Sequence, residues 1–159
     1  MIKATFITLG KLKEKYLKDA VQEYTKRLSR YCQLEMVEIP AVSMSENPSQ
    51  KEIEAALSRE SDVILKKIPS DCFVFALCVE GKQRSSEEFA NEIKRLVNSG
   101  KNLCFIIGSS YGLDEEVKKR ANTRLSLSEM TFPHQLFRVM LLEQLYRGFK
   151  IIEGSTYHK

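Results

Sequence analysis

The chain has 159 residues, so we expect one domain over residues 1–159 that buries roughly two thirds of the surface exposed by the unfolded chain. Hydrophobic residues make up 43% and charged residues 29%, a balance that excludes intrinsic disorder, because disordered chains combine few apolar residues with high net charge. The formal charge of +4 is mildly basic, which favours an acidic partner without requiring one.

The first half of the chain alternates strand and helix patterns. The run IKATFITL (Ile2–Leu9) predicts a buried strand, and apolar residues at every fourth position over residues 16–28 predict a helix. LEMVEI (Leu34–Ile39) predicts a second strand. After a loop rich in Pro, Ser and Asn, Ser49 stands three residues before Glu52, a spacing that predicts a capping box at the start of a second helix.

The second half continues the alternation. CFVFALCV (Cys72–Val79) is apolar throughout, as in a central strand covered on both faces, and we expect Gly81 to end it. Ser85 and Glu88 predict a capping box for the next helix. The remaining elements are predicted as a strand at Leu103–Ile107, a short helix from Asp114, a strand at Arg124–Ser128 and a helix at Gln135–Lys150.

This alternation predicts an α/β fold with a mostly parallel sheet flanked by helices. Ligands of such sheets bind where the strands end at their carboxyl edge. Three segments follow predicted strands at that edge: EGK after Val79, GSSYG after Ile107 and EMTFP after Ser128. These segments are the candidate ligand-binding loops.

The loop segments favour a ligand held by backbone groups and apolar walls. Gly108 follows an apolar strand and removes a side chain where a ligand could approach, although a tight turn alone would also explain it. Neither G-x-G-x-x-G nor G-K-[ST] is present, so nucleotide phosphate binding is weakly supported. EMTFP offers amides and carbonyls beside large apolar side chains, which suits adenine, while core packing of Met130 and Phe132 explains the segment equally well.

The last predicted helix carries an arginine among leucines. Arg138 falls on the apolar face, near the helix start, where the helix dipole disfavours a cation. Such a residue needs an anionic or aromatic partner, and both an internal ion pair and a functional contact remain open. Because this helix is apolar around most of its circumference, it needs burial on two sides, which its own sheet and a second subunit can provide.

The tail STYHK is polar, aromatic and cationic. A frayed terminus is the ordinary interpretation of so short a segment. However, Tyr157 can stack on a base, His158 can move a proton near neutral pH and Lys159 can contact a phosphate. Basic residues also gather at positions 11–18, at 118–124 and at the C-terminus, and for any one of these clusters alone we expect a solvated helix face.

The cysteines indicate a reduced intracellular protein. Cys32, Cys72, Cys78 and Cys104 show neither C-x-x-C spacing nor nearby histidines, so we expect buried free thiols, no metal site and a cytoplasmic location. The opening MIKATFITLG is too short for a signal peptide, and no apolar run reaches the roughly 18 residues of a membrane span. We therefore expect no membrane partner.

The segments GSSYG, LSLSEMTFPHQLFRVMLLEQLYRG and the terminal YHK together resemble a known family. They are similar to the SPOUT-class methyltransferases that act on a pseudouridine of large-subunit ribosomal RNA, and the length and the opening FITLGKLK are similar as well. The resemblance implies S-adenosyl-L-methionine as cofactor, a trefoil knot in the C-terminal part and a homodimer with the last helix in its interface. The cofactor residues it implies are Ala76, Leu77, Gly108, Leu127, Ser128, Glu129, Met130, Thr131 and Phe132.

The resemblance also implies the reaction, which is methylation of N3 of a pseudouridine in 23S ribosomal RNA, on the assembled ribosome. Methyl transfer from a sulfonium requires mainly alignment of the nucleophile and exclusion of water. The catalytic hypothesis is that Arg147 or Arg138 stabilises the oxyanion that forms as the N3 proton leaves. His158 or a water accepts that proton, and Tyr157 positions the base.

The sequence departs from the family pattern at two places. Relatives commonly carry Gly-Gly-x-x-Gly where this chain has Gly108, Ser109, Ser110, Tyr111 and Gly112, and their tail often ends in arginine rather than Lys159. We expect Tyr111 to alter the rim of the cofactor pocket. Lysine keeps the charge but loses the planar guanidinium fork.

Three other functions remain open at this point. A nicotinamide-dependent oxidoreductase would need a glycine fingerprint after the first strand and an acidic residue after the second, and GKLKEK supplies no such fingerprint. A SPOUT methyltransferase acting on transfer RNA would share every feature above. A non-catalytic protein that binds RNA or the ribosome would suit the basic clusters, and only a cofactor pocket separates it from an enzyme.

Overall fold

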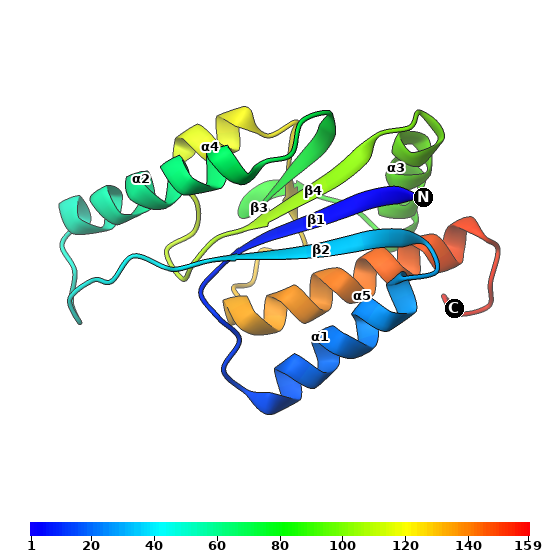
Figure 1. The fold of residues 1–159 in the computed structure, drawn as a ribbon, viewed down its shortest axis with the longest axis horizontal. Coiled ribbons are helices and arrows are strands. Elements are labelled where there is room, and N and C mark those ends of the chain that lie inside the picture. Colours follow the sequence, from blue (N-terminus) through cyan, green and yellow to red (C-terminus); the bar gives the residue numbers. More distant parts are fainter.

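Five parallel strands form one sheet in the computed structural model, which describes residues 1–159 (Figure 1). The strand order is β2-β1-β4-β3-β5, and every neighbouring pair is parallel. This confirms the predicted α/β fold with a parallel sheet flanked by helices. The strands are β1 (Ile2–Leu9), β2 (Cys32–Ile39), β3 (Cys72–Gln83), β4 (Asn102–Ile107) and β5 (Thr123–Ser126).

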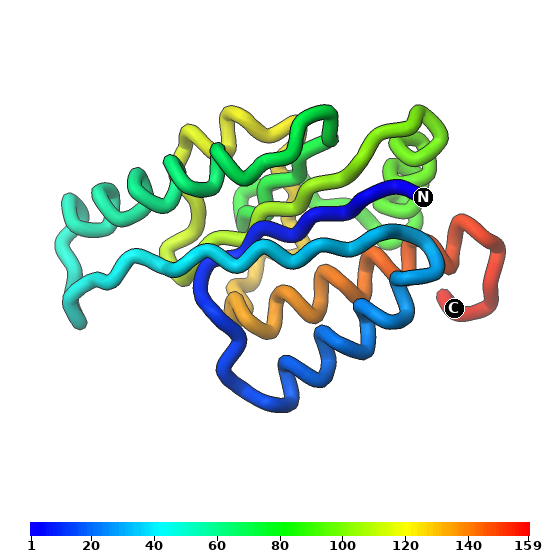
Figure 2. Tube along the Cα trace, in the orientation of Figure 1, coloured from blue at the N-terminus to red at the C-terminus, as the bar shows by residue number.

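The helices cover both faces of the sheet (Figures 1 and 2). One face carries the three helices α1, α3 and α5, and the other carries α2 and α4, as parallel strands require, because each crossover returns along a face. Each face has its own apolar core. The helices are α1 (Lys15–Leu28), α2 (Gln50–Lys67), α3 (Ser86–Asn98), α4 (Glu115–Arg120) and α5 (His134–Ile152).

Helix α5 lies between α1 and α3 on the sheet, which explains why its sequence has almost no polar side. Leu141, Leu142 and Leu145 are fully buried beneath it, and Phe149 stacks on Tyr31 with ring centroids 5.2 Å apart. Within one chain, α5 therefore packs against α1 on one side, α3 on the other and the sheet underneath. The sheet and the neighbouring helices already account for most of the burial that the sequence demands.

The two predicted capping boxes differ in outcome. At α3 the box is complete: the Ser85 hydroxyl accepts from the Glu88 amide, and the Glu88 carboxylate accepts from the Ser85 amide. At α2 only half of it forms. Ser49 accepts from the Glu52 amide, but the Glu52 carboxylate binds the amide and hydroxyl of Ser45 instead, which pins the preceding loop to the helix.

The prediction that Gly81 ends the third strand is wrong. β3 continues to Gln83, and its pairing with β5 shifts register, so that both Leu77 and Lys82 face Leu125. The residues between them leave the ladder as a bulge. A Cβ at Gly81 would lie 2.8 Å from the backbone carbons of Arg124 and Leu125, so glycine allows β5 to close against the bulge.

The fifth strand ends earlier than the alternation of its sequence predicts. β5 stops at Ser126, and residues 127–133 form a loop before α5 rather than continuing the strand to Ser128. None of the helices combines the length and the apolar character needed to cross a membrane. The trefoil knot implied by the family resemblance stays a prediction.

Replacing Gly81 by alanine should destabilise the protein. The added methyl group meets the β5 backbone, which cannot move without breaking the ladder, so we expect urea denaturation to show an unfolding free energy lower by about 1–3 kcal/mol. Gly148→Ala is the matched control, because the nearest atom to a Cβ there is 3.7 Å away and alanine favours a helix. Equal stabilities of the two variants would contradict the role assigned to Gly81.

Candidate cofactor and catalytic site

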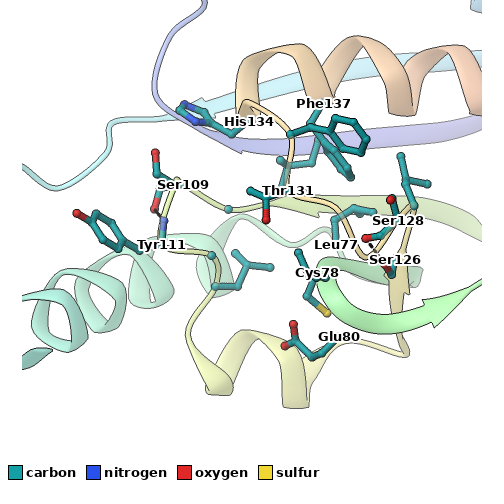
Figure 3. A pocket seen from close by; sticks show the side chains of 18 of the residues that line it. Leu77, Cys78, Glu80, Ser109, Tyr111, Ser126, Ser128, Thr131, His134 and Phe137 are labelled. Carbon is teal, nitrogen blue, oxygen red and sulfur yellow. Dashed lines mark hydrogen bonds between the residues drawn. The ribbon is translucent and has the colours of Figure 1, made fainter.

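The loops that follow β3, β4 and β5 meet at one edge of the sheet and enclose a cavity of ≈ 550 Å³ (Figure 3). This volume lies within the range of small-molecule and cofactor sites. All three segments singled out in the sequence contribute to it. The lining residues are Leu77, Cys78, Val79, Glu80, Ile107, Gly108, Ser109, Ser110, Tyr111, Gly112, Leu113, Lys118, Ser126, Leu127, Ser128, Met130, Thr131, Phe132, Pro133, His134 and Phe137.

Most of the residues predicted to bind the cofactor lie on this cavity. Leu77, Gly108, Leu127, Ser128, Met130, Thr131 and Phe132 line it. Two do not. Ala76 is fully buried within β3, and the Glu129 side chain is exposed on the loop after β5 without lining the cavity.

The bulge of β3 supplies one wall that the sequence analysis did not assign. It turns Cys78 and Glu80 toward the cavity (Figure 3), and the Lys118 ammonium donates to the Glu80 carboxylate. This bond lowers the pKa of Glu80, so the carboxylate stays ionised, whereas burial raises the pKa of the Cys78 thiol. The signal for this wall was the glycine at position 81, which marks a bulge as well as a strand end.

The turn after β4 closes the second wall. The Gly112 amide donates to the Ser109 carbonyl over 2.9 Å, and a Cβ on Gly108 would lie 2.4 Å from the Gly112 carbonyl oxygen. Gly108 is therefore required by the turn itself, as the simpler interpretation of the sequence held, and the turn also leaves its backbone open to the cavity. Tyr111 lies half exposed at the rim.

Serine hydroxyls shape the third wall, the loop between β5 and α5. The Ser126 hydroxyl donates to the Ser128 carbonyl over 2.9 Å, and the Ser128 hydroxyl accepts from the Met130 amide over 3.0 Å. These bonds turn the chain so that Thr131 projects into the middle of the cavity (Figure 3). Met130 lines the same cavity with 73% of its surface exposed, so it is not the core residue that the sequence also allowed.

The first turn of α5 adds His134 and Phe137, neither of which was predicted as a site residue. Burial, and to a lesser extent the charge of Arg138, lowers the pKa of His134, so the ring is neutral near pH 7. The sequence signal was available: His134 directly follows EMTFP, and a helix beginning there must present its first turn to the preceding loop.

Arg138 lies away from this cavity and is 1% exposed. Its guanidinium donates to Glu38 over 3.0 Å and to the carbonyls of Leu9 and Gly10 over 2.8 and 2.7 Å. These bonds tie α5 to the ends of β1 and β2. The two terminal nitrogens of Arg138 are thus bonded inside the fold, whereas the buried Nε has no partner. The role of oxyanion donor considered for Arg138 stays a prediction.

The C-terminal tail packs against α5 rather than fraying. Arg147 donates to both carboxylate oxygens of Glu143, at 2.7 to 3.3 Å, and its guanidinium lies 4.9 Å from the ring centroid of Tyr157. The Tyr157 hydroxyl donates to Glu143 over 3.1 Å. His158 bridges Arg147, at 3.1 Å, and Glu87 of α3, at 2.7 Å. Three of the predicted catalytic residues therefore form one cluster.

The protonation of this cluster follows from its bonds. Arg147 can only donate, so Nδ1 of His158 accepts from it, and Nε2 then carries the proton that is donated to Glu87. Burial and the Glu143 carboxylate raise the pKa of Tyr157, which stays a neutral phenol. The cluster thus presents a guanidinium, an imidazole and an aromatic ring beside one another.

Comparison with known proteins agrees with this architecture. A family model described as "Predicted SPOUT methyltransferase" matches residues 2–158. The chain belongs to the SPOUT methyltransferase family. Two curated proteins named "Ribosomal RNA large subunit methyltransferase H", from Clostridium beijerinckii and Exiguobacterium sibiricum, are 54% and 49% identical over 156 residues, which cover 98% of this chain and 98% of each relative.

Solved structures support the SPOUT fold independently of close sequence similarity. A probable methyltransferase from Bordetella pertussis matches with a TM-score of 0.57 at 15% identity, over 92% of this chain and 96% of that one. A putative methylase family protein from Neisseria gonorrhoeae matches with a TM-score of 0.54 at 14% identity, over 99% and 86%. The protein is thus a SPOUT methyltransferase, an S-adenosylmethionine-dependent class of enzyme, and the nicotinamide oxidoreductase is excluded.

Replacing Arg138 by methionine should lower stability without filling or opening the cavity. The change leaves the Leu9 and Gly10 carbonyls without their donor, so we expect the unfolding free energy in urea to fall by about 2–4 kcal/mol. Glu38→Gln is the control. Because Glu38 is partly exposed, its substitution should lower the unfolding free energy by less than about 1 kcal/mol. A larger loss for Glu38→Gln than for Arg138→Met would show that the ion pair, and not the bonds to the Leu9 and Gly10 carbonyls, contributes most to stability.

Proposed function

We propose that this protein methylates N3 of a pseudouridine in 23S ribosomal RNA, using S-adenosyl-L-methionine, on the assembled ribosome in the cytoplasm. The similarity over nearly the whole chain to relatives named for large-subunit ribosomal RNA supports the substrate. The structural observation that supports the chemistry is that one chain carries both a cavity at the carboxyl edge of the sheet and a cluster of Arg147, Tyr157 and His158 on α5 and the tail.

The cavity fits the proposed cofactor. Apolar side chains of Leu77, Met130 and Phe132 offer walls for an adenine ring, and the glycine backbone at position 108 allows close approach. Glu80 places an ionised carboxylate beside this space, where it can accept from ribose hydroxyls or face a cation. When bound, S-adenosylmethionine supplies a methyl group on a sulfonium that is an excellent leaving group.

The cluster on α5 suits an imide nucleophile. Deprotonation of N3 places charge on the two flanking carbonyl oxygens, and the guanidinium of Arg147, which Glu143 positions, can donate to that charge. Tyr157 provides a face for the base to stack on. Nδ1 of His158 becomes a proton acceptor once Arg147 turns from the imidazole to the substrate oxygen.

The proposal includes a homodimer that brings the two halves of the site together. Phe137 is the last residue of α5 on the cavity, and Arg147 lies ten positions further along the helix, so about 15 Å lie between their backbones. The reacting atoms must come within about 3.5 Å of one another. Since a helix does not bend to close this gap, we infer that the Arg147 cluster of one subunit serves the cavity of the other.

The rim of the cavity supports this arrangement. Val79, Tyr111 and Met130 are large apolar residues that line it and remain exposed, and Leu136 lies exposed on the neighbouring first turns of α5. Contiguous exposed apolar groups mark interaction surfaces. A second copy seated on this rim would cover them, exclude water from the site and carry its own tail to the opening.

The decisive experiment compares substrates. Purified protein and labelled S-adenosylmethionine are incubated in parallel with unmodified ribosomes, free ribosomal subunits and transfer RNA, and the RNA is examined by mass spectrometry. We expect one methyl group on a pseudouridine of large-subunit RNA from assembled ribosomes. Label on transfer RNA alone would favour the alternative SPOUT substrate. No heat in calorimetry with S-adenosylmethionine, together with no methylation of any RNA, would favour a protein that only binds RNA.

Mixing two inactive variants tests whether the site spans two subunits. Thr131→Tyr should block the cavity from an exposed loop position, and His158→Ala should lower methylation much more than cofactor affinity. If each site combines the cavity of one subunit with the tail of the other, every heterodimer has one working site of two. Because about half of the dimers in an equal refolded mixture are heterodimers, the mixture as a whole regains about a quarter of the wild-type sites. Refolded mixtures as inactive as the separate variants, despite confirmed heterodimers, would place each site within one chain.

A further inference from the structure

A lysine-rich segment lies beside the mouth of the cofactor cavity. Residues 11–18, which we name the basic segment, run from the end of β1 into the first turn of α1. The Lys13 amide donates to the Gln135 side chain over 3.2 Å, and Gln135 directly follows His134 on the cavity wall. Figure 3 shows the loop after β1 passing close to His134. The fold thus fixes the basic segment next to the opening.

The lysines of this segment have few partners within the protein. It holds four lysines against one glutamate, and all four side chains are exposed. Only Lys15 forms an ion pair, with Asp19 over 2.7 Å. Lys11, Lys13 and Lys18 form none, so their charge is available to an external anion.

The other two basic clusters are largely neutralised inside the chain. On α4 and β5, Lys118 pairs with Glu80, Lys119 with Glu116 and Arg124 with Glu115. At the C-terminus Arg147 and Lys150 pair with glutamates of α5 and its cap. The solvated helix face expected for any basic cluster therefore describes these two better than it describes the basic segment.

Stability of the fold does not explain these lysines. The first turn of α1 has no acidic residue, and its N-cap, Glu14, makes no side-chain bond to the helix. Lysines at positions 15 and 18 instead lie at the positive end of the helix dipole, where cations are unfavourable. Tyr16 is also 66% exposed, although a buried position would stabilise the protein more.

We propose that the basic segment binds the phosphate backbone of the RNA substrate next to the target nucleotide, and that Tyr16 stacks on a neighbouring unpaired base. The inference rests on the proposed function, because it takes RNA as the substrate. Lysines contact phosphates without reading sequence, and aromatic rings stack on splayed bases. The segment thus orients the RNA, while the cavity and the α5 cluster perform the chemistry.

Charge reversal of the two loop lysines tests the proposal. The variant Lys11→Glu/Lys13→Glu is compared with Lys3→Glu/Lys94→Glu, which changes the net charge equally at exposed, unpaired lysines on the first residues of β1 and on α3. Methylation of ribosomes is followed as kcat/KM over a series of salt concentrations. Calorimetry with S-adenosylmethionine and light scattering check the cavity and the oligomeric state.

We expect the loop variant to lower kcat/KM at least about 10-fold and to reduce the slope of log(kcat/KM) against log salt by about 2, with cofactor affinity unchanged. The control variant should keep the wild-type slope. Equal slopes in the two variants would overturn the proposal while leaving the proposed function intact. Absence of ribosomal RNA methylation by the wild type would instead refute the proposed function itself.

Tyr16 is tested separately. Tyr16→Phe should keep nearly full activity, because the ring stacks without its hydroxyl, whereas Tyr16→Ala should raise KM several-fold. A change of molecular mass in light scattering for Tyr16→Ala would show that the ring contacts another protein subunit, and would overturn the stacking role.

Discussion

The parallel pairing of β3, β4 and β5 is the constraint on which the site depends. Parallel strands end at the same edge of a sheet, so the three loops that follow them must emerge side by side, whatever their sequences. The bulge of β3, the glycine turn after β4 and the serine-shaped loop before α5 then differ only in which groups they present. The apolar sheet fixes the position of the cavity, and the loops determine its chemistry.

A second constraint is the length of α5. Its first turn lines the cavity and its last turns hold the tail cluster, so one rigid element separates the two functional groups within a chain. This separation looks unproductive in a monomer. In a symmetric dimer whose two α5 helices run antiparallel, the separation would be useful, because the last turns of each helix could reach the first turn of the partner's helix.

The sequence predicted those features that depend on local pattern. Apolar runs located the strands, Ser85 with Glu88 located the start of α3, and the three loops were identified from the strand ends alone. Features that depend on contacts distant in the chain could not be predicted. Arg138 was recognised as unusual, but Glu38 lies one hundred positions earlier, and no local pattern distinguishes an internal partner from a substrate.

The same limit applies to Gly81 and to the tail. Whether a glycine ends a strand or permits a bulge depends on the neighbouring strand, here the backbone of Arg124 and Leu125. Whether a short polar tail frays depends on groups that it can reach, here Glu143 on α5 and Glu87 on α3. The dimer, the knot and the individual site roles stay predictions, because they concern chain threading, a second copy and bound molecules.

Arg138 donates hydrogen bonds to the carbonyls of Leu9 and Gly10. These bonds fasten the loop that carries the lysines to the helix that forms one wall of the cavity, through a side chain that is itself 1% exposed. An RNA that binds the proposed basic segment would therefore be held at a position relative to the cavity that the fold itself sets.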